Sequence, residues 1–331
     1  MFEERGLRGI RRSRGATMAR MDPYDLAETQ GRGIMRAAVL RELGVHPREL
    51  AKRVQRGDLV RVRSGAYVRR ALWDAAGPDE RYRLRIGGAV LAARHPVTLS
   101  HVSAAAWHGL PIIGRRPDAV HLVDTDRSGG RRTPQVVVHR AGPEPEPVVI
   151  DGVRCTSLVR TLVDVAATEP FARAVAMIDA ALARGITVES LLAELDLIAP
   201  ARGHRMAQAA IEFGDGRSGS AGESLSRAQI HLLGFVAPEL QVRFDGILGS
   251  YALVDFYWRA LRLIGEFDGR IKYSRSLDLS GRDTAAVLFD EKRREDALRR
   301  LGERVARWDW TVANTPRELF ALLSEFGVPR R

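Results

Sequence analysis

Residues 21–75 show a helical spacing of apolar positions that gives way to a strand-like alternation. A first short helix contains Leu26, and a second, ending at Gly44, carries the apolar positions Ile34, Ala37, Ala38, Leu40 and Leu43. Pro47 suits the first turn of a third helix over residues 47–56. Residues 59–63 alternate as a strand does, Ser64 and Gly65 form a turn, and residues 66–68 return. Three short helices followed by a two-stranded hairpin predict a winged helix-turn-helix.

Basic side chains follow the outer side of the third helix and the hairpin. Leu50 and Val54 face the core of this segment, which leaves four cations mostly outward: Arg48, Lys52, Arg53 and Arg56. The hairpin adds Arg61 and Arg63. In a winged helix the third helix enters the major groove and the wing touches phosphates. These six residues are therefore the candidate DNA contacts. The alternative is a solvated basic helix on an ordinary small domain.

The segment after residue 222 alternates helix and strand patterns. Ser220 and Glu223 have capping-box spacing and open an amphipathic helix that ends at Gly234. Strands are expected over residues 240–244, 253–258 and 263–268, followed by a helix over 283–301 and a strand over 304–310. A second capping box, Thr315 to Glu318, opens a terminal helix. This order is an αβββαβ core with one more helix.

Three carboxylates fall on two of these strands. Asp255 lies in an otherwise apolar strand, and Glu266 and Asp268, two residues apart, face the same side of the next strand. Carboxylates that converge on an apolar sheet repel one another unless a cation lies among them. Oxygen ligands of this kind suit Mg²⁺ or Mn²⁺, which can activate water and stabilise charge on a phosphate. The sequence therefore predicts a metal site at Asp255, Glu266 and Asp268.

Other residues could assist such a site. The chain has three lysines and 49 arginines, and two of the lysines, Lys272 and Lys292, follow the carboxylates. An ammonium has a pKa that burial can shift, so Lys272 is the leading auxiliary group. Glu223 is either a further catalytic carboxylate or only the second member of its capping box. The alternative for the whole cluster is a solvated hairpin whose acids face water.

The remainder of the chain suggests further divisions. Residues 1–20 are a basic extension, 21–75 the winged-helix domain, 76–213 an α+β middle region, 214–222 a Gly/Ser-rich linker and 223–331 the last domain. In the middle region we expect a small-residue helix stopped by Pro111, strands near 119–123 and 135–139 joined as a hairpin, and a helix after residue 153. His101 and His108 are expected to pack or cap, and Arg160 and Asp164 have the spacing of a helical ion pair. The fold class is therefore a multi-domain α/β protein.

Composition narrows the class of protein. The net charge is +11, and residues 1–75 carry +8 of it, with 17 Lys+Arg against 9 Asp+Glu. Such a concentration attracts phosphate backbones or an acidic partner. A single cysteine, Cys155, excludes an internal disulfide and fits a reducing cytoplasm. We expect no membrane span and no secretory signal, because long apolar runs are lacking.

Two resemblances sharpen these expectations. The segment from Leu43 to Tyr67, with Gly44, Gly57 and Gly65 at its turns, resembles the N-terminal domain of AbiEi-type antitoxins. Stretches of the middle region are similar to the segment that follows in those proteins. That resemblance implies a bacterial regulator that binds its own promoter, with a toxin or other protein as a second partner.

The last 110 residues or so resemble the restriction-endonuclease-like, PD-(D/E)xK superfamily, and within it the very-short-patch-repair (Vsr)-like domains. The likeness rests on six stretches: Glu223-Ser224, Gln241, Val254-Asp255-Phe256, and residues 265–273, 292–298 and 304–308. It implies a Mg²⁺-dependent phosphodiesterase with Asp255 and Glu266 as ligands. Asp268 departs from the pattern, which has a lysine there, so Lys272 or Lys292 would have to supply the charge.

Two functions follow from these patterns. The first is a DNA endonuclease that a winged helix targets and that Mg²⁺ or Mn²⁺ activates. The alternative is a non-catalytic, antitoxin-like repressor with a degenerate nuclease fold. The oligomeric state is left open.

Overall fold

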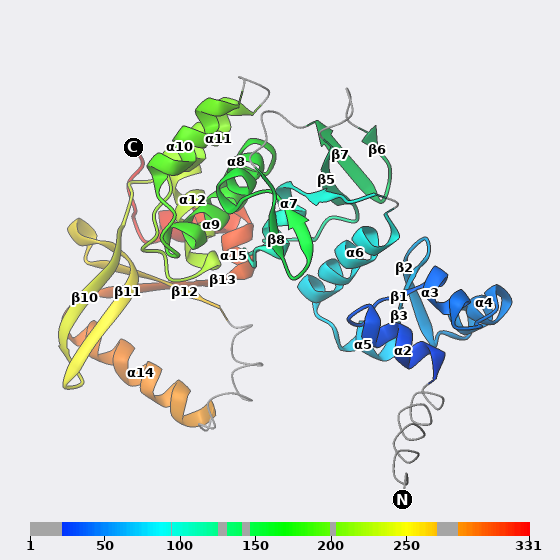
Figure 1. Ribbon diagram of the computed structural model, residues 1–331. Helices are drawn as coiled ribbons and strands as arrows, with labels where there is room; N and C mark the ends of the chain where they lie inside the picture. Colours follow the sequence, from blue (N-terminus) through cyan, green and yellow to red (C-terminus); the bar gives the residue numbers. More distant parts are fainter. Residues whose placement is uncertain (1–21, 94, 125–130, 141–145, 199–202, 270–283) are drawn as a thin grey trace, which may run out of the picture. The chain divides into compact units, whose positions relative to one another are not determined.

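The computed structural model describes residues 22–93, 95–124, 131–140, 146–198, 203–269 and 284–331, which form two compact units (Figure 1). Of the described residues, 22–93, 95–99, 116–124, 131–140 and 147–155 belong to the first unit, and 100–115, 146, 156–198, 203–269 and 284–331 belong to the second. The segment expected as a linker, 214–222, lies within the second unit.

The start of the first unit has the element order of a winged helix. Helices α2 (Pro23–Gln30), α3 (Ala37–Glu42) and α4 (Pro47–Arg56) precede the hairpin of β2 (Leu59–Arg63) and β3 (Ala66–Arg69). A short strand, β1 (Met35–Arg36), pairs with β3 and completes a sheet of order β1-β3-β2. Apolar side chains of all three helices share one core with Met35 and Leu59. The assignment of Ile34 to the second helix is wrong, because the chain is extended through β1 and the helix begins only at Ala37.

The rest of the first unit is a six-stranded sheet with two helices, α5 (Arg70–Ala75) and α6 (Pro78–Ala92). Its strands, in the order β6-β7-β5-β4-β9-β8, are β6 (Arg131–Arg132), β7 (Val136–Arg140), β5 (Val120–Asp124), β4 (Thr98–Leu99), β9 (Val153–Cys155) and β8 (Val148–Ile150). The strands expected near 119–123 and 135–139 exist as β5 and β7, but the prediction that they form a hairpin is wrong. They pair in parallel, and β6 is the antiparallel neighbour of β7.

The second unit opens with helices that pack against one another. They are α7 (His101–Trp107), α8 (Leu158–Thr168), α9 (Phe171–Leu182), α10 (Val188–Leu197), α11 (His204–Glu212) and α12 (Ala221–Leu232). His108 Nε2 lies 2.9 Å from the Thr156 carbonyl oxygen, so this side chain joins the end of α7 to the segment before α8. The expected ion pair is confirmed, since Arg160 Nε donates to Asp164 Oδ1 at 2.9 Å.

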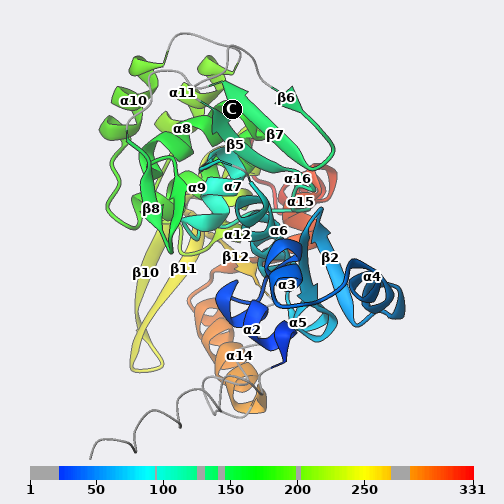
Figure 2. The ribbon, with the colours of Figure 1, turned by 45° about the vertical axis from the view of Figure 1, so that its right-hand side comes forward.

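Helices cover both faces of the sheet in the second unit. Strands β10 (Glu239–Ile247), β11 (Ser250–Trp258) and β12 (Leu263–Asp268) are antiparallel, and β13 (Arg304–Asp309) lies parallel to β12. A 3₁₀ turn, η1 (Arg259–Leu261), joins β11 to β12, and α14 (Thr284–Arg300) precedes β13. Leu298 of α14 packs with Val305, whereas Trp308 donates to Ser226 of α12 at 2.8 Å. Positions 305 and 308 point to opposite faces of a strand, so α14 and α12 flank the sheet (Figure 2).

The two predicted capping boxes have different outcomes. Ser220 Oγ accepts from the Glu223 amide at 3.3 Å and opens α12, as expected, but the Glu223 carboxylate accepts from the Gly219 amide instead of closing the box. Thr315 precedes α16 (Pro316–Glu325), and its side chain makes no cap among the described residues. The short helix α15 (Trp310–Asn314) ends directly before it. Thr315 therefore occupies the expected N-cap position of the terminal helix, but the prediction that its side chain forms a capping box is wrong.

Replacing Gly222 with alanine is expected to destabilise the second unit. A Cβ there would overlap Cε1 of Phe267, whose ring packs edge-on against Trp310, so the ring cannot yield freely. We expect a loss of about 1–3 kcal/mol in the free energy of unfolding, measured with urea. Gly269→Ala is the control, because its Cβ would meet the same ring at an ordinary 3.6 Å. Equal stability of the two variants would contradict this account.

Candidate functional site

Helix α4 carries a stripe of exposed cations. Arg48, Lys52 and Arg56 are all exposed and stand four residues apart, so they share one face of the helix. Pro47 begins the helix, and Gly57, with φ +85°, ends it in the left-handed conformation that favours glycine. Pro47 and Gly57 thus fix the two ends of α4, and the three cations lie between them.

Arg53, a fourth predicted contact, lies on another face. Its guanidinium group is 4.0 Å from the centre of the Tyr24 ring, and its Nε lies 3.6 Å from Glu49 Oε1. Tyr24 in turn donates to Glu49 at 3.2 Å. These contacts join α4 to α2, so the role of Arg53 visible in the structure is to position the helix.

The two wing residues also differ. Arg61 is exposed on β2 and donates to Ser64 Oγ at 3.0 Å, next to the turn at Gly65. Arg63 is half-buried, and burial lowers the pKa of its guanidinium group. The pairing of β2 with β3 is irregular between these residues, so their side chains do not follow the regular alternation of a strand between two faces. Of the six predicted DNA contacts, four are therefore exposed: Arg48, Lys52, Arg56 and Arg61.

In the second unit, two predicted carboxylates meet at a shared amide. Gln241 Nε2 lies 2.9 Å from Glu223 Oε2 and 3.4 Å from Asp255 Oδ1, so α12, β10 and β11 each contribute one side chain. Glu223 is only 8% exposed. Asp255 also accepts from the backbone amide of Phe267 on β12 at 2.8 Å. The apolar pattern around Asp255 indicated a buried carboxylate, and in the structure Asp255 is half-buried between the buried residues Val254 and Phe256.

The electrostatics of this cluster let Asp255 keep its proton to a higher pH than an ordinary aspartate does. Burial, and then the nearby Glu223 carboxylate, raise the pKa of Asp255 to about 6. Hydrogen bonds from Phe267 and Gln241 and the positive charge of Arg294 oppose this shift without cancelling it. A carboxyl group near neutrality is suited to accepting or donating a proton at physiological pH.

Asp255→Asn is expected to stabilise the fold at pH 7.5. A folded-state pKa above the unfolded value means that stability falls as the pH rises from about 4 to about 6, and stays lower above that window. The amide variant lacks this titration and can still accept from Phe267. We expect a gain on the order of 1–3 kcal/mol at pH 7.5 and none near pH 4, measured by urea unfolding at both values. A gain that does not depend on pH would contradict the shift.

The remaining members of the predicted metal site have other surroundings. Glu266, on β12 beside Asp255, accepts from Arg294 of α14 at 3.1 Å. Asp268 is half-buried and lies in register with Asp309 of β13. Lys292 is exposed on α14. Lys272 lies outside the described residues. Sequence reasoning did not single out Arg294, because one arginine among many on a helix carries no distinguishing signal.

The fit of a divalent cation is partial. Glu223 and Asp255 present carboxylate oxygens of the type that Mg²⁺ and Mn²⁺ prefer, but Gln241 faces them with its amide nitrogen. Among the residues that the structure describes, however, no three His, Cys, Asp or Glu side chains are grouped closely enough to hold an ion. Glu266, the expected ligand, contacts a guanidinium group instead. The metal site stays a prediction.

Comparisons with known proteins bear on both regions. Residues 21–70 match the sequence profile of a family described as transcriptional regulator, AbiEi antitoxin, so this segment is similar to AbiEi-type regulator domains, and its element order is compatible with a winged helix. The chain is also 31% identical over 279 residues to the uncharacterized proteins MT2308 and Rv2248 from two strains of Mycobacterium tuberculosis. Those alignments cover 78% of this chain and 95% of each relative.

A crystal structure of the RV2827C protein from Mycobacterium tuberculosis has a TM-score of 0.36 and 16% identity, covering 61% of this chain and 78% of that one. Within the described residues, none of the helices combines the length and apolarity that crossing a membrane requires.

Proposed function

Because the chain belongs to the family of these two uncharacterized Mycobacterium tuberculosis proteins and carries a segment similar to AbiEi-type regulator domains, we propose that it is a DNA-binding transcriptional regulator. Helix α4 is the element that reads the major groove, and the β2–β3 hairpin is the wing that contacts phosphates.

The observation that carries this proposal is the stripe of Arg48, Lys52 and Arg56. Three exposed cations on one face match the repeated negative charge of a DNA backbone. Gln55 is exposed beside them, and glutamine is a residue type that hydrogen-bonds the edges of bases. The tie of Arg53 to Tyr24 and Glu49 supports the same proposal, since it holds α4 in place without using that face.

A binding assay with the full chain tests the proposal. DNA from upstream of the chain's own gene is titrated against a shuffled duplex of equal length, over a range of salt concentrations. We expect the upstream DNA to bind more tightly and the affinity to fall linearly on logarithmic axes as salt increases. Equal affinity for both duplexes at every salt concentration would contradict a promoter-specific regulator.

A second candidate function is hydrolysis of a phosphodiester bond in the second unit. The observation that favours it is the raised pKa of Asp255 beside the buried Glu223, on a sheet of order β10-β11-β12-β13 flanked by α12 and α14. A bound Mg²⁺ or Mn²⁺ would supply the stabilisation of charge on the phosphate. Asp255 would hold or release a proton, and Glu223 and Gln241 would orient the Asp255 side chain. The further candidates for the catalytic site are Glu266, Asp268, Lys272 and Lys292.

The nuclease hypothesis has its own experiment. Supercoiled plasmid is incubated with the full chain and Mg²⁺ or Mn²⁺, with Asp255→Ala and Glu266→Ala as variants. Cleavage that depends on the metal and is lost in both variants supports an enzyme. Promoter binding by a chain that cuts no DNA with either metal leaves the regulator as the function. Cleavage that persists in both variants would contradict this site.

A protein partner, in the sense of a toxin neutralised by an antitoxin, is a further proposal for the region 76–213. The observation that favours it is the edge strand β8, where Val148 and Val149 are 38% and 66% exposed, because an unprotected apolar edge invites another strand. Co-expression with a candidate toxin tests it. Protection from growth arrest should be lost in Val149→Lys and kept in the exposed control Arg154→Lys.

A further inference from the structure

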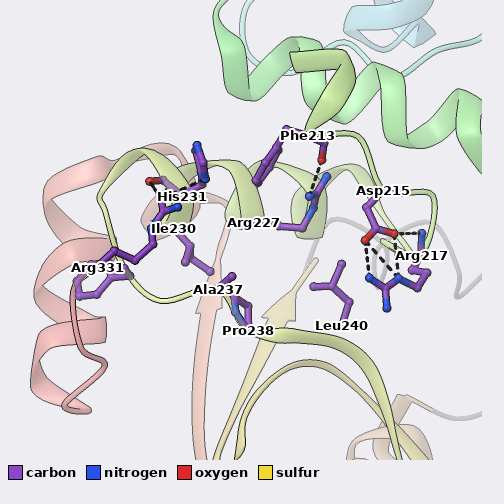
Figure 3. A pocket seen from close by; sticks show the side chains of 11 residues that line it. Phe213, Asp215, Arg217, Arg227, Ile230, His231, Ala237, Pro238, Leu240 and Arg331 are labelled. Atoms are coloured by element: carbon purple, nitrogen blue, oxygen red, sulfur yellow. Dashed lines mark hydrogen bonds and ion pairs between the residues drawn. The ribbon is translucent and has the colours of Figure 1, made fainter. Parts of the chain in front are cut away.

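A hollow of about 200 Å³ lies in the second unit (Figure 3), and its lining does not include Glu223, Gln241 or Asp255. Its walls come from α12, from the segments on either side of that helix and from Arg331. It is smaller than the roughly 300–1,000 Å³ of pockets for drug-sized ligands, so it suits a single ring with a substituent.

Arg227 forms one wall and has an unmet hydrogen-bonding capacity. Its side chain is nearly fully buried, and its terminal nitrogens donate to both carboxylate oxygens of Asp179 at 2.9 Å and to the Phe213 carbonyl at 2.8 Å. Its Nε is buried and has no hydrogen-bond partner among the described residues. A buried N–H without an acceptor is costly. This nitrogen has almost no accessible surface, so a ligand in the hollow cannot reach it, and the donors to a ligand must come from the other arginines of the lining.

Further donors surround the hollow. Arg217 and Arg331 join Arg227, against two carboxylates: Asp215, to which Arg217 is paired at 2.7 Å, and Asp179, which is paired with Arg227. Arg331 donates to the carbonyl of His231 at 2.9 Å. Burial, and then the charges of Arg331 and Arg227, lower the pKa of His231, as expected for a site of positive potential. The potential therefore favours an anionic ligand.

The rest of the lining is apolar. Ile230, Phe235, Pro238 and Leu240 form this part of the wall, and Phe213 stacks beneath the guanidinium group of Arg227 at 4.2 Å. A hydrated ion such as phosphate would leave this surface unused. A flat ring that bears a carboxylate would use both halves of the lining, because rings pack on apolar and aromatic side chains while arginines hold the carboxylate.

We propose that this hollow is a binding site for a small aromatic carboxylate. Its carboxylate accepts from Arg217 and Arg331, and its ring packs against Phe235 and Leu240. The site is separate from the DNA-binding helix and from the carboxylate cluster, so the proposal does not depend on either proposed function.

Ligand-observed NMR with the full chain and benzoate tests the site. Benzyl alcohol supplies the ring without the charge, and acetate supplies the charge without the ring. We expect saturable binding of benzoate and at least about tenfold weaker binding of each control, since each lacks one half of the contacts. Acetate binding as tightly as benzoate, or no saturable binding of benzoate, would overturn the proposal.

Matched arginine variants locate the binding. Arg217→Ala is expected to weaken benzoate binding about tenfold or more, because it removes a charge-assisted donor and leaves Asp215 to repel the ligand. Arg243→Ala is the control: Arg243 is also exposed and also pairs with an aspartate two residues away, Asp245, but it does not line the hollow. Equal binding by the two variants would place benzoate elsewhere and overturn the site.

Discussion

Replacing Arg48, Lys52 and Arg56 together with glutamate is expected to abolish specific DNA binding. All three are exposed on one face of α4, and reversing them places three negative charges where the proposal places phosphates and base edges. We expect affinity to fall at least about a hundredfold at moderate salt. The salt dependence should also become shallower, by about 0.9 for each phosphate that the variant no longer neutralises. Titration of the upstream duplex at several salt concentrations measures both.

The control for this variant has the same change in total charge at other exposed positions: Arg83, Arg154 and Arg205, each replaced with glutamate. An equal loss in the control would mean that overall charge, not α4, drives binding. Full binding by the α4 variant would remove α4 from the interface. The replaced side chains of α4 are exposed, so its core with α2 and β2 remains, and a thermal unfolding curve checks this.

Asp179→Ala is expected to cause the largest loss of stability. Asp179, on α9, is 1% exposed and accepts two hydrogen bonds from Arg227 of α12. Burial raises the pKa of Asp179, and Arg227 opposes that shift. Removing the carboxylate leaves the Arg227 charge buried without a partner, which costs about 3–5 kcal/mol. Urea unfolding at pH 7.5 measures the change.

The double variant Asp179→Leu with Arg227→Met distinguishes the effect of an isolated buried charge from that of altered packing. Replacing both charges with apolar groups of similar size leaves no isolated ion, so its cost should be well below that of Asp179→Ala. A double variant at least as unstable as the single one would show that packing around the pair, not charge, determines the stability.

Local patterns predicted most of the elements of the fold. The α4 helix was expected at its observed bounds because Pro47 and Gly57 are strong end signals, and the strands β10 to β13 followed from alternation. The parallel pairing of β5 with β7 was missed, since a hairpin is the simplest interpretation of two nearby strands. Pairing direction depends on neighbours that are distant in sequence, such as β4, which local alternation does not reveal.

The candidate sites were predictable to different degrees. Exposure of Arg48, Lys52 and Arg56 follows from helical spacing alone. Spacing could not show that Arg53 stacks on Tyr24 or that Glu266 meets Arg294, because each pair joins separate helices and strands. The meeting of Glu223 and Asp255 at Gln241 likewise depends on how α12 lies on the sheet.

The parallel pairing of β12 with β13 has a consequence for the order of assembly during synthesis. Strands β10, β11 and β12 are neighbours in sequence, so each can pair as soon as it emerges, whereas β13 can join only after α14 has been made. All three members of the Glu223, Gln241 and Asp255 cluster precede that step. We therefore expect all three side chains of the cluster to be available in the nascent chain before Trp308, which contacts Ser226 on the α12 side of the sheet.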